Sequence, residues 1–197
     1  MTTRVGYERL RQVRRAMLGG LSGTVVEVGA GEGRDLADLP GSADWIGIEP
    51  SSRARRRLAE KAAARGFRAP LAARAEALPV ADGSIDVVLA VVALCSVDDL
   101  DRALNEARRV LRPGGRLVFL EHVAAPAGSG LRVLQRAATP VTAALDRNCH
   151  LARDPLAAAA RTGFTTVSVD RYDVTGRVPG IAWPFVMYEG AISPARH

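Results

Sequence analysis

The chain has 197 residues, of which 48% are hydrophobic and 24% are charged. This length suffices for one domain with a buried core, and the apolar share excludes an intrinsically disordered chain. The chain has two cysteines, Cys95 and Cys149, without a CxxC spacing. We therefore expect free thiols in a reducing compartment, no disulfide framework and no metal site. From its length, we expect the chain to form a single domain that covers residues 1–197.

Lysine and arginine outnumber the acidic residues 27 to 21, which gives a net charge of +6 and raises the question of a nucleic-acid partner. The arginines are spread along the chain without interleaved aromatic side chains that could stack on bases, so no nucleic-acid partner is expected. The N-terminus has no apolar signal-peptide core, and no apolar run is long enough to span a membrane. We expect a cytoplasmic protein, for which weak peripheral contact with a membrane stays open. The oligomeric state is not predicted.

Short runs rich in valine and isoleucine alternate with alanine, arginine and leucine stretches of helical period, which is typical of an α/β protein with a parallel sheet. Helices are expected at residues 7–18, 51–65, 98–111, 131–145 and 155–162. Strands are expected at residues 24–30, 43–50, 67–72, 85–94, 115–123, 165–174 and 181–192. The connection between the last two strands is too short for a parallel crossover. We therefore predict one doubly wound, mostly parallel seven-stranded sheet with an antiparallel C-terminal edge strand.

The segment VVEVGAGEGRDL places Gly29, Gly31 and Gly33 directly after a predicted strand and before a predicted helix. Glycines let a backbone turn sharply and approach a ligand, and a helix N-terminus presents free N–H groups. The third glycine comes one residue too early for the dinucleotide pattern GxGxxG, and Glu27 would face an incoming pyrophosphate. If the loop is more than a tight turn, its spacing favours a cationic ligand over a dinucleotide.

Glu49 ends the second predicted strand, 20 residues after Gly29. A carboxylate at this position can accept both hydrogen bonds from a ribose diol. A single acid at a strand end would otherwise be an ordinary solvated residue. Because it follows a GxGxG loop in this register, Glu49 indicates a ribose-binding position.

These residues, together with DGSIDVV and LRPGGRLV, resemble the class I S-adenosylmethionine-dependent methyltransferases over essentially the whole chain. AEALPVADGSIDVVLAVVALCSVDD and LNEARRVLRPGGRLVFLEH are similar to the quinone-type branch. LCSV, LRPGG, EHV, NCHLARD at 148–154 and the aromatic tail strand are similar to the methyltransferase-like alkyl-thiol methyltransferases of the endoplasmic reticulum and their short bacterial relatives. Those membrane relatives carry an N-terminal anchor, which we do not expect here.

The resemblance implies S-adenosylmethionine as cofactor and S-adenosylhomocysteine as product. Glu27 would lie near the ammonium group, Glu49 would bind the ribose hydroxyls and Glu76 would cap the adenine edge. Many relatives have an aspartate where this chain has Arg74, so adenine recognition must come from the backbone or from Glu76. The complete implied set is Glu27, Gly29, Ala30, Gly31, Gly33, Glu49, Pro50, Ser51, Ala75, Glu76, Ala90 and Val91.

Methyl transfer is an in-line displacement at an activated carbon, so positioning of the acceptor dominates. A thiol needs little help to ionise, whereas an amine or a hydroxyl usually needs a base. His122 ends the fifth predicted strand and His150 lies in NCHLARD, and both are candidates to accept the proton of the acceptor. Ordinary structural roles stay open for both histidines, and Cys95 and Cys149 are interpreted as buried side chains. We expect the LCSV turn, the EHV strand end and NCHLARD to converge.

The preferred function is an S-adenosylmethionine-dependent methyltransferase that acts on a small lipophilic thiol, which would be its small-molecule partner. The alternative with the same cofactor is transfer to nitrogen or oxygen of a phospholipid headgroup, a quinone or a secondary metabolite. The alternative of another class is a non-catalytic binding module on the same fold. The presence of Glu27, Glu49 and all three glycines argues against that last alternative.

Overall fold

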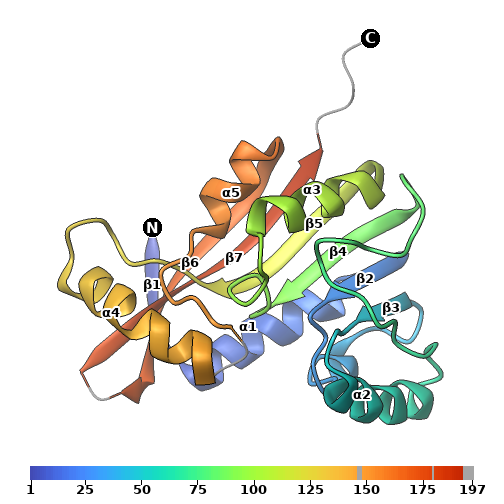
Figure 1. The fold of residues 1–197 in the computed structure, drawn as a ribbon, viewed down its shortest axis with the longest axis horizontal. Helices are drawn as coiled ribbons and strands as arrows, with labels where there is room; N and C mark the ends of the chain where they lie inside the picture. The colour runs from blue at the N-terminus through green and yellow to red at the C-terminus, as the bar shows by residue number, and fades with distance from the viewer. Residues whose placement is uncertain (146–147, 179, 193–197) are drawn as a thin grey trace.

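The computed structural model describes residues 1–145, 148–178 and 180–192, which form one sheet covered by helices (Figure 1). The helices are α1 (Tyr7–Gly19), α2 (Ser52–Ala64), α3 (Leu100–Val110), α4 (Gly130–Leu145) and α5 (Pro155–Arg161), with a short 3-10 helix, η1 (Leu36–Asp38). The strands are β1 (Thr2–Gly6), β2 (Thr24–Val28), β3 (Asp44–Ile48), β4 (Ile85–Val91), β5 (Leu111–His122), β6 (Phe164–Val178) and β7 (Ile181–Ile192).

The seven strands follow the order β1-β6-β7-β5-β4-β2-β3. Strand β7 runs antiparallel to both of its neighbours, and all other pairs are parallel. The predicted fold class, a mostly parallel seven-stranded sheet with an antiparallel C-terminal edge strand, is confirmed in its number of strands and in their directions. The antiparallel strand does not lie at the edge, because β6 pairs with the side of β7 that faces away from β5. The antiparallel strand β7 lies between β5 and β6, and the two edge strands are β1 and β3.

Two local predictions are wrong. The segment at 67–72 forms no strand and makes a single bridge, between Leu71 and Ile48, because Pro70 cannot donate to a strand ladder. The strand β1, which the sequence did not indicate, supplies the seventh strand by pairing with β6. The helix expected after the glycine loop is only η1, since Pro40 and Gly41 come one residue after its end.

The helices cover both faces of the sheet (Figure 1). Helices α3 and α5 bury apolar side chains against one face, and α1 and α2 bury theirs against the other. Neighbouring residues of one strand point to opposite faces, so Val25 and Val26 belong to different clusters, as do Val87 and Val88. This explains the near-continuous apolar runs of the inner strands, which are buried on both sides.

Helices α2, α3 and α5 begin at side chains that cap them. Ser51 Oγ accepts a hydrogen bond from Ala54 N at 3.4 Å, Asp99 Oδ1 from Arg102 N and Asp154 Oδ1 from Ala157 N, both at 3.0 Å. Such caps satisfy amide groups that the first helical turn leaves without partners. The caps of α2 and α3 fix the loops that lead from the ends of β3 and β4 into these helices.

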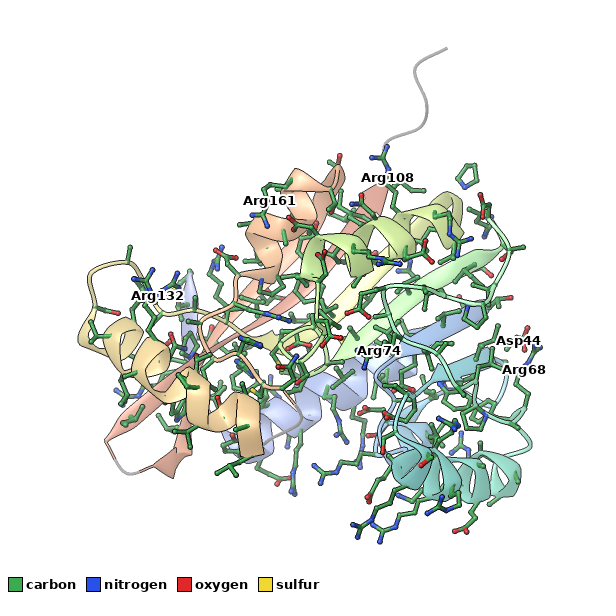
Figure 2. All side chains as sticks on the ribbon, viewed as in Figure 1. Asp44, Arg68, Arg74, Arg108, Arg132 and Arg161 are labelled. Atoms are coloured by element: carbon green, nitrogen blue, oxygen red, sulfur yellow. The ribbon has the colours of Figure 1, made fainter. Side chains whose placement is uncertain are left out.

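The arginines labelled in Figure 2 lie on different sides of the molecule. Three of them pair with exposed acids, Arg74 with Asp98, Arg68 with Asp44 at 2.6 Å and Arg161 with Asp101 at 2.7 Å. Exposed pairs of this kind add little to stability, so much of the positive charge serves as solvated surface. Among the residues that the structure describes, none of the helices is both long and apolar enough to cross a lipid bilayer.

Candidate active site

The C-terminal ends of four adjacent parallel strands, β3, β2, β4 and β5, meet along one edge of the sheet. Val28 at the end of β2 pairs with Ile48 of β3 and with Ala90 of β4, and Val91 pairs with Leu120 of β5. In open α/β sheets, ligands bind outside these ends. The predicted cofactor residues of β2, β3 and β4 therefore share one edge.

The glycine loop follows β2 and adopts left-handed backbone conformations at Gly29, Gly31 and Gly33, with φ of 66°, 59° and 73°. A Cβ on Gly29 would lie 2.7 Å from the Cβ of Ala93, in the turn after β4. Glycine is thus required both for the turn and for the close approach of two strand ends. The loop is held by hydrogen bonds from Ala30 N to Ile48 O at 3.1 Å and from Gly33 N to Ala30 O at 3.0 Å.

Glu49 lies directly after β3 and is buried. Its Oε2 accepts a hydrogen bond from Gly31 N at 2.9 Å and its Oε1 one from Ser51 N at 2.8 Å. The carboxylate therefore joins the glycine loop to the residue that caps α2. Pro50 and Ser51, also expected at the cofactor, continue the chain from this point.

Glu27 is 1% exposed and lies in β2, two residues before Gly29. Its Oε2 accepts a hydrogen bond from Trp45 Nε1 at 2.7 Å. Burial, and then the nearby carboxyl of Asp35, raise the pKa of Glu27 to about 8. A cationic ligand group would favour the charged form of Glu27, which the structure by itself disfavours.

Ala75 and Glu76 lie in the loop before β4, and both are buried. Glu76 Oε1 accepts hydrogen bonds from Asp98 N at 2.7 Å and Asp99 N at 3.2 Å, so this oxygen orders the loop before α3. Arg74, which stands where many relatives have an aspartate, forms an ion pair with Asp98. The loop at 74–76 is thereby attached to the turn that follows β4.

Ala90 and Val91 end β4, and the next residue, Val92, has a positive φ of 50°. A β-branched residue in this conformation is strained, and such strain clusters at functional sites. Val92 N donates to Leu120 O at 2.9 Å, which holds the strained turn against β5. The turn then leads through Ala93 to Cys95.

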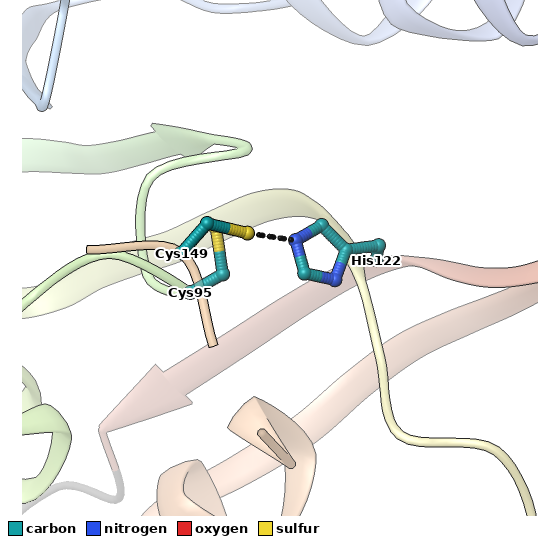
Figure 3. A group of neighbouring side chains, drawn as sticks. All are labelled: Cys95, His122 and Cys149. Carbon is teal, nitrogen blue, oxygen red and sulfur yellow. Dashed lines mark hydrogen bonds between the residues drawn. The ribbon is translucent and has the colours of Figure 1, made fainter. Parts of the chain in front are cut away.

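Beyond this turn, Cys95, His122 and Cys149 come together from three separate segments (Figure 3). Cys149 Sγ lies 3.4 Å from His122 Nε2, and the two thiols and the imidazole have ligand atoms within 4.8 Å of one another. Both cysteines are buried and reduced. Hydrogen bonding to Cys149, and then burial, raise the pKa of Cys95. The expectation of free, buried thiols is confirmed, whereas their proximity was not predicted.

The expected convergence of the three segments is confirmed. His150 N donates to Cys95 O at 2.9 Å, and the His150 ring lies 3.1 Å from Asn148 Oδ1, measured from Nε2. Arg153 donates to the carbonyls of Leu94 and Val97 in the turn after β4. Burial, and then Arg153, lower the pKa of His150, which favours the neutral form of its imidazole.

Glu121 is a residue of this site that sequence reasoning did not assign. It is 0% exposed, and its Oε1 accepts hydrogen bonds from Ala93 N and, at 2.7 Å, from Leu94 N. Burial raises its pKa to about 7, against the opposing effect of His122. The sequence signal for Glu121 is an acidic residue at the end of an otherwise apolar strand. Such a carboxyl is expected to be buried, and a buried carboxyl needs hydrogen-bond partners.

The amino-acid sequence matches the model of a family described as "Methyltransferase domain" over residues 26–119. This stretch runs from β2 into β5 and includes the glycine loop, Glu49, the loop at 74–76 and the turn after β4. The matched region thus includes the edge of the sheet that carries the candidate cofactor residues.

Among characterised proteins, the chain is 31% identical to the thiol S-methyltransferase TMT1B of Mus musculus over 182 residues, which cover 86% of this chain and 75% of that protein. It is 34% identical to the thiol S-methyltransferase TMT1A of Homo sapiens over 150 residues, which cover 74% of this chain. The match spans 62% of the length of human TMT1A.

Among solved structures, an S-adenosylmethionine-dependent methyltransferase of Thermotoga maritima superposes with a TM-score of 0.65 and is 27% identical. The superposition covers 95% of each chain. The agreement therefore extends beyond the glycine loop to the arrangement of the whole sheet.

Proposed function

Because the chain belongs to the family of S-adenosylmethionine-dependent methyltransferases that includes mouse TMT1B, we propose that it transfers a methyl group from S-adenosylmethionine to the sulfur of a small lipophilic thiol. The observation that carries this proposal is the 31% identity with TMT1B over 86% of the chain, since that relative is a thiol S-methyltransferase. The geometry of the sheet edge supports it independently.

The residues at this edge fit the cofactor. Glycine is required at Gly29 by backbone conformation and by the approach of Ala93, which leaves the loop backbone open to a ligand. Glu49 is oriented by two amides toward this loop and would accept the ribose hydroxyls. Glu27 would face the ammonium group, and Pro50, Ser51, Ala75 and Glu76 would border the adenine. The bound cofactor supplies a methyl group that its sulfonium already activates.

The acceptor would approach beyond the ends of β4 and β5, beside Val91 and the cluster of Cys95, His122 and Cys149. A thiol reacts as thiolate, so the site must favour loss of the thiol proton. His122 and His150 are the groups that we assign to this task. The neutral imidazole of His150 and the proximity of His122 to two thiols support the assignment.

Helix α4 supports a lipophilic acceptor. It is attached to the site through Gln135, which is bonded to Val123 O at 2.9 Å and to Ala125 N at 2.7 Å, and through Thr142, whose Oγ1 donates to Cys149 O at 2.8 Å. The same helix exposes four large apolar side chains: Val133, Leu134, Val141 and Leu145. An apolar surface on a helix that is attached to the site suits an alkyl chain.

The proposal is tested with three acceptors of equal chain length that end in a thiol, an amine or a hydroxyl. The full chain is incubated with each acceptor and S-adenosylmethionine, and methylated products are identified by mass spectrometry. We expect S-methylation of the thiol and a rate that rises with alkyl length. Methylation of the amine or hydroxyl in preference to the thiol would reject the thiol acceptor and favour the N- or O-methyltransferase alternative.

A further inference from the structure

Cys95, His122 and Cys149 lie far apart in the sequence and meet at the end of β5, with all three ligand atoms within 4.8 Å of one another (Figure 3). We propose that these three side chains bind one thiophilic divalent cation, Zn²⁺ in the first place, and that the fourth position of the ion takes the sulfur of the methyl acceptor. The first half of this inference stands by itself, and the second half rests on the proposed function.

The separation of the ligand atoms suits tetrahedral zinc. Bond lengths of about 2.3 Å to sulfur and about 2.0 Å to nitrogen place neighbouring tetrahedral ligands about 3.5 Å apart. Cys149 Sγ and His122 Nε2 lie 3.4 Å apart. An ion can therefore bind between these two atoms with little movement of the backbone, and Cys95 Sγ, which lies within 4.8 Å of both, has to move toward the ion by at most about 1 Å.

The type of ligands selects the metal. Two thiolates and one imidazole favour a soft or borderline cation such as Zn²⁺ over Mg²⁺ or Ca²⁺, which prefer oxygen ligands. Structural zinc sites close with four protein ligands, whereas catalytic sites use three and leave one position open. Three ligands from this chain correspond to the open kind.

The backbone that carries each cysteine is fixed by hydrogen bonds from neighbouring segments. Cys95 O accepts from His150 N at 2.9 Å, and Cys149 O accepts from the hydroxyl of Thr142 at 2.8 Å. The turn before Cys95 is also held by the buried carboxyl of Glu121 through Ala93 N and Leu94 N. Partners of this kind orient ligands before the metal arrives and raise its affinity.

The charges around the cluster are compatible with a divalent cation. Two thiolates neutralise Zn²⁺, and the imidazole binds without charge. Glu121 and Arg153 both lie within electrostatic range of Cys149, and they carry opposite charges when ionised. A buried site without net charge avoids most of the cost of desolvation.

The open position gives the acceptor thiol a way to ionise. Its sulfur binds the cation and releases its proton to solvent, since a thiol that coordinates zinc is deprotonated. In the zinc-loaded chain His122 is a ligand of the ion, so its proposed role as proton acceptor applies to the metal-free chain. The sulfur lone pair then forms the new S–CH3 bond. The S–CH3 bond of the donor sulfonium breaks, and its electron pair stays on the donor sulfur. The thioether product is a weaker ligand than the thiolate and leaves.

The first half of the inference is tested by titrating Co²⁺ into the full chain after reduction with a phosphine and removal of metal with a chelator. We expect one ion per chain, a thiolate-to-cobalt charge-transfer band and the intense visible bands of tetrahedral cobalt, all displaced by Zn²⁺. This measurement needs no variant, so misfolding of a mutant cannot obscure it. The absence of the charge-transfer band would overturn the site.

Variants assign the ligands. Cys95→Ser, Cys149→Ser and His122→Gln should each weaken Zn²⁺ binding by more than about 100-fold, the upper end of what loss of a mere supporting contact causes. His150→Gln is the matched control, because the ring of His150 is directed to Asn148 and should leave the affinity unchanged. Equal losses for His122→Gln and His150→Gln, or a Cys95–Cys149 disulfide in protein isolated with Zn²⁺ present, would overturn the assignment.

The second half is tested on the cobalt-loaded chain. An alkyl thiol should shift the visible bands, and an alcohol of the same length should not. The absence of a shift would overturn the open position. Unchanged thiol methylation by a chain that binds no zinc would reject the second half of the inference and leave the proposed function intact. Zinc-loaded chain that binds thiol and transfers no methyl group would reject the proposed function and leave the site.

Discussion

Gly29 and Ala93 approach so closely that a Cβ at Gly29 would lie 2.7 Å from the Cβ of Ala93. This contact joins the glycine loop after β2 to the strained turn after β4, which leads to Cys95. The candidate cofactor residues and the acceptor side of the site are therefore in direct packing contact. Substitutions at this contact should affect both.

Gly29→Ala should weaken binding of S-adenosylhomocysteine and lower stability. A side chain at a φ of 66° costs about 1–2 kcal/mol, and the contact with Ala93 adds to it. Gly19→Ala is the control, because a Cβ there meets nothing within 4 Å. Thermal unfolding and calorimetry report the two effects. Equal behaviour of both variants would show that the Gly29 contact is not required.

Glu49→Ala should weaken binding of S-adenosylhomocysteine, because the two hydrogen bonds from the ribose hydroxyls to the Glu49 carboxylate are lost. The cost is on the order of 2–4 kcal/mol, or roughly 30- to 700-fold in the dissociation constant. Asp44→Ala, at the opposite end of the same strand β3, is the control and should bind normally. Glu49→Gln, which keeps one acceptor, should lie between them. Unchanged affinity in Glu49→Ala would remove this residue from the ribose site.

Glu27 should make the stability of the unliganded chain fall as the pH rises. Its pKa is about 8 in the folded state and about 4.5 in the unfolded state, so the folded state binds a proton more tightly than the unfolded state. The stability that this proton adds to the folded state is fully present below about pH 4.5 and is lost as the pH rises through about 8. Glu27→Gln stays neutral and can still accept from Trp45. Its unfolding free energy relative to wild type should therefore rise between these pH values. A difference independent of pH would contradict this cause.

His122→Ala should lower thiol methylation about tenfold or more at neutral pH, within or just below the range typical of proton-transfer catalysis. The deficit should shrink as the pH approaches the thiol's own pKa of about 8.5, because the acceptor then ionises in solution. The ratio of wild-type to variant rate is measured from about pH 6 to about pH 9. A constant ratio would assign His122 to positioning of the acceptor.

The parts of the fold that the sequence predicts are those with strong local patterns. The inner strands β2, β4 and β5 are apolar runs, and α2 begins at the capping residue Ser51. Strand β1 has no such pattern, since it is short and largely exposed, and its partner β6 lies about 170 residues later in the chain. Strand pairing at that separation depends on the whole topology, which local periodicity does not contain.

The candidate site was predicted in a similar, partial way. Glu27 and Glu49 could be named because strand ends of a parallel sheet meet at one edge. That His122 and His150 lie near the turn after β4 followed from the same rule. The proximity of Cys95 to Cys149 did not, since the 53 residues of chain between them have no spacing pattern. Glu121 was hidden because one acid in an apolar strand does not reveal which amides it binds.

The most direct test of the central claim, that this sheet edge binds a methyl donor, is calorimetric titration of the full chain with S-adenosylhomocysteine, alongside a titration with NADH. The account predicts one-site binding of S-adenosylhomocysteine and no measurable heat with NADH, because the GxGxG loop and Glu27 disfavour a pyrophosphate. Saturable binding of NADH that S-adenosylhomocysteine cannot displace, with no binding of S-adenosylhomocysteine itself, would contradict it.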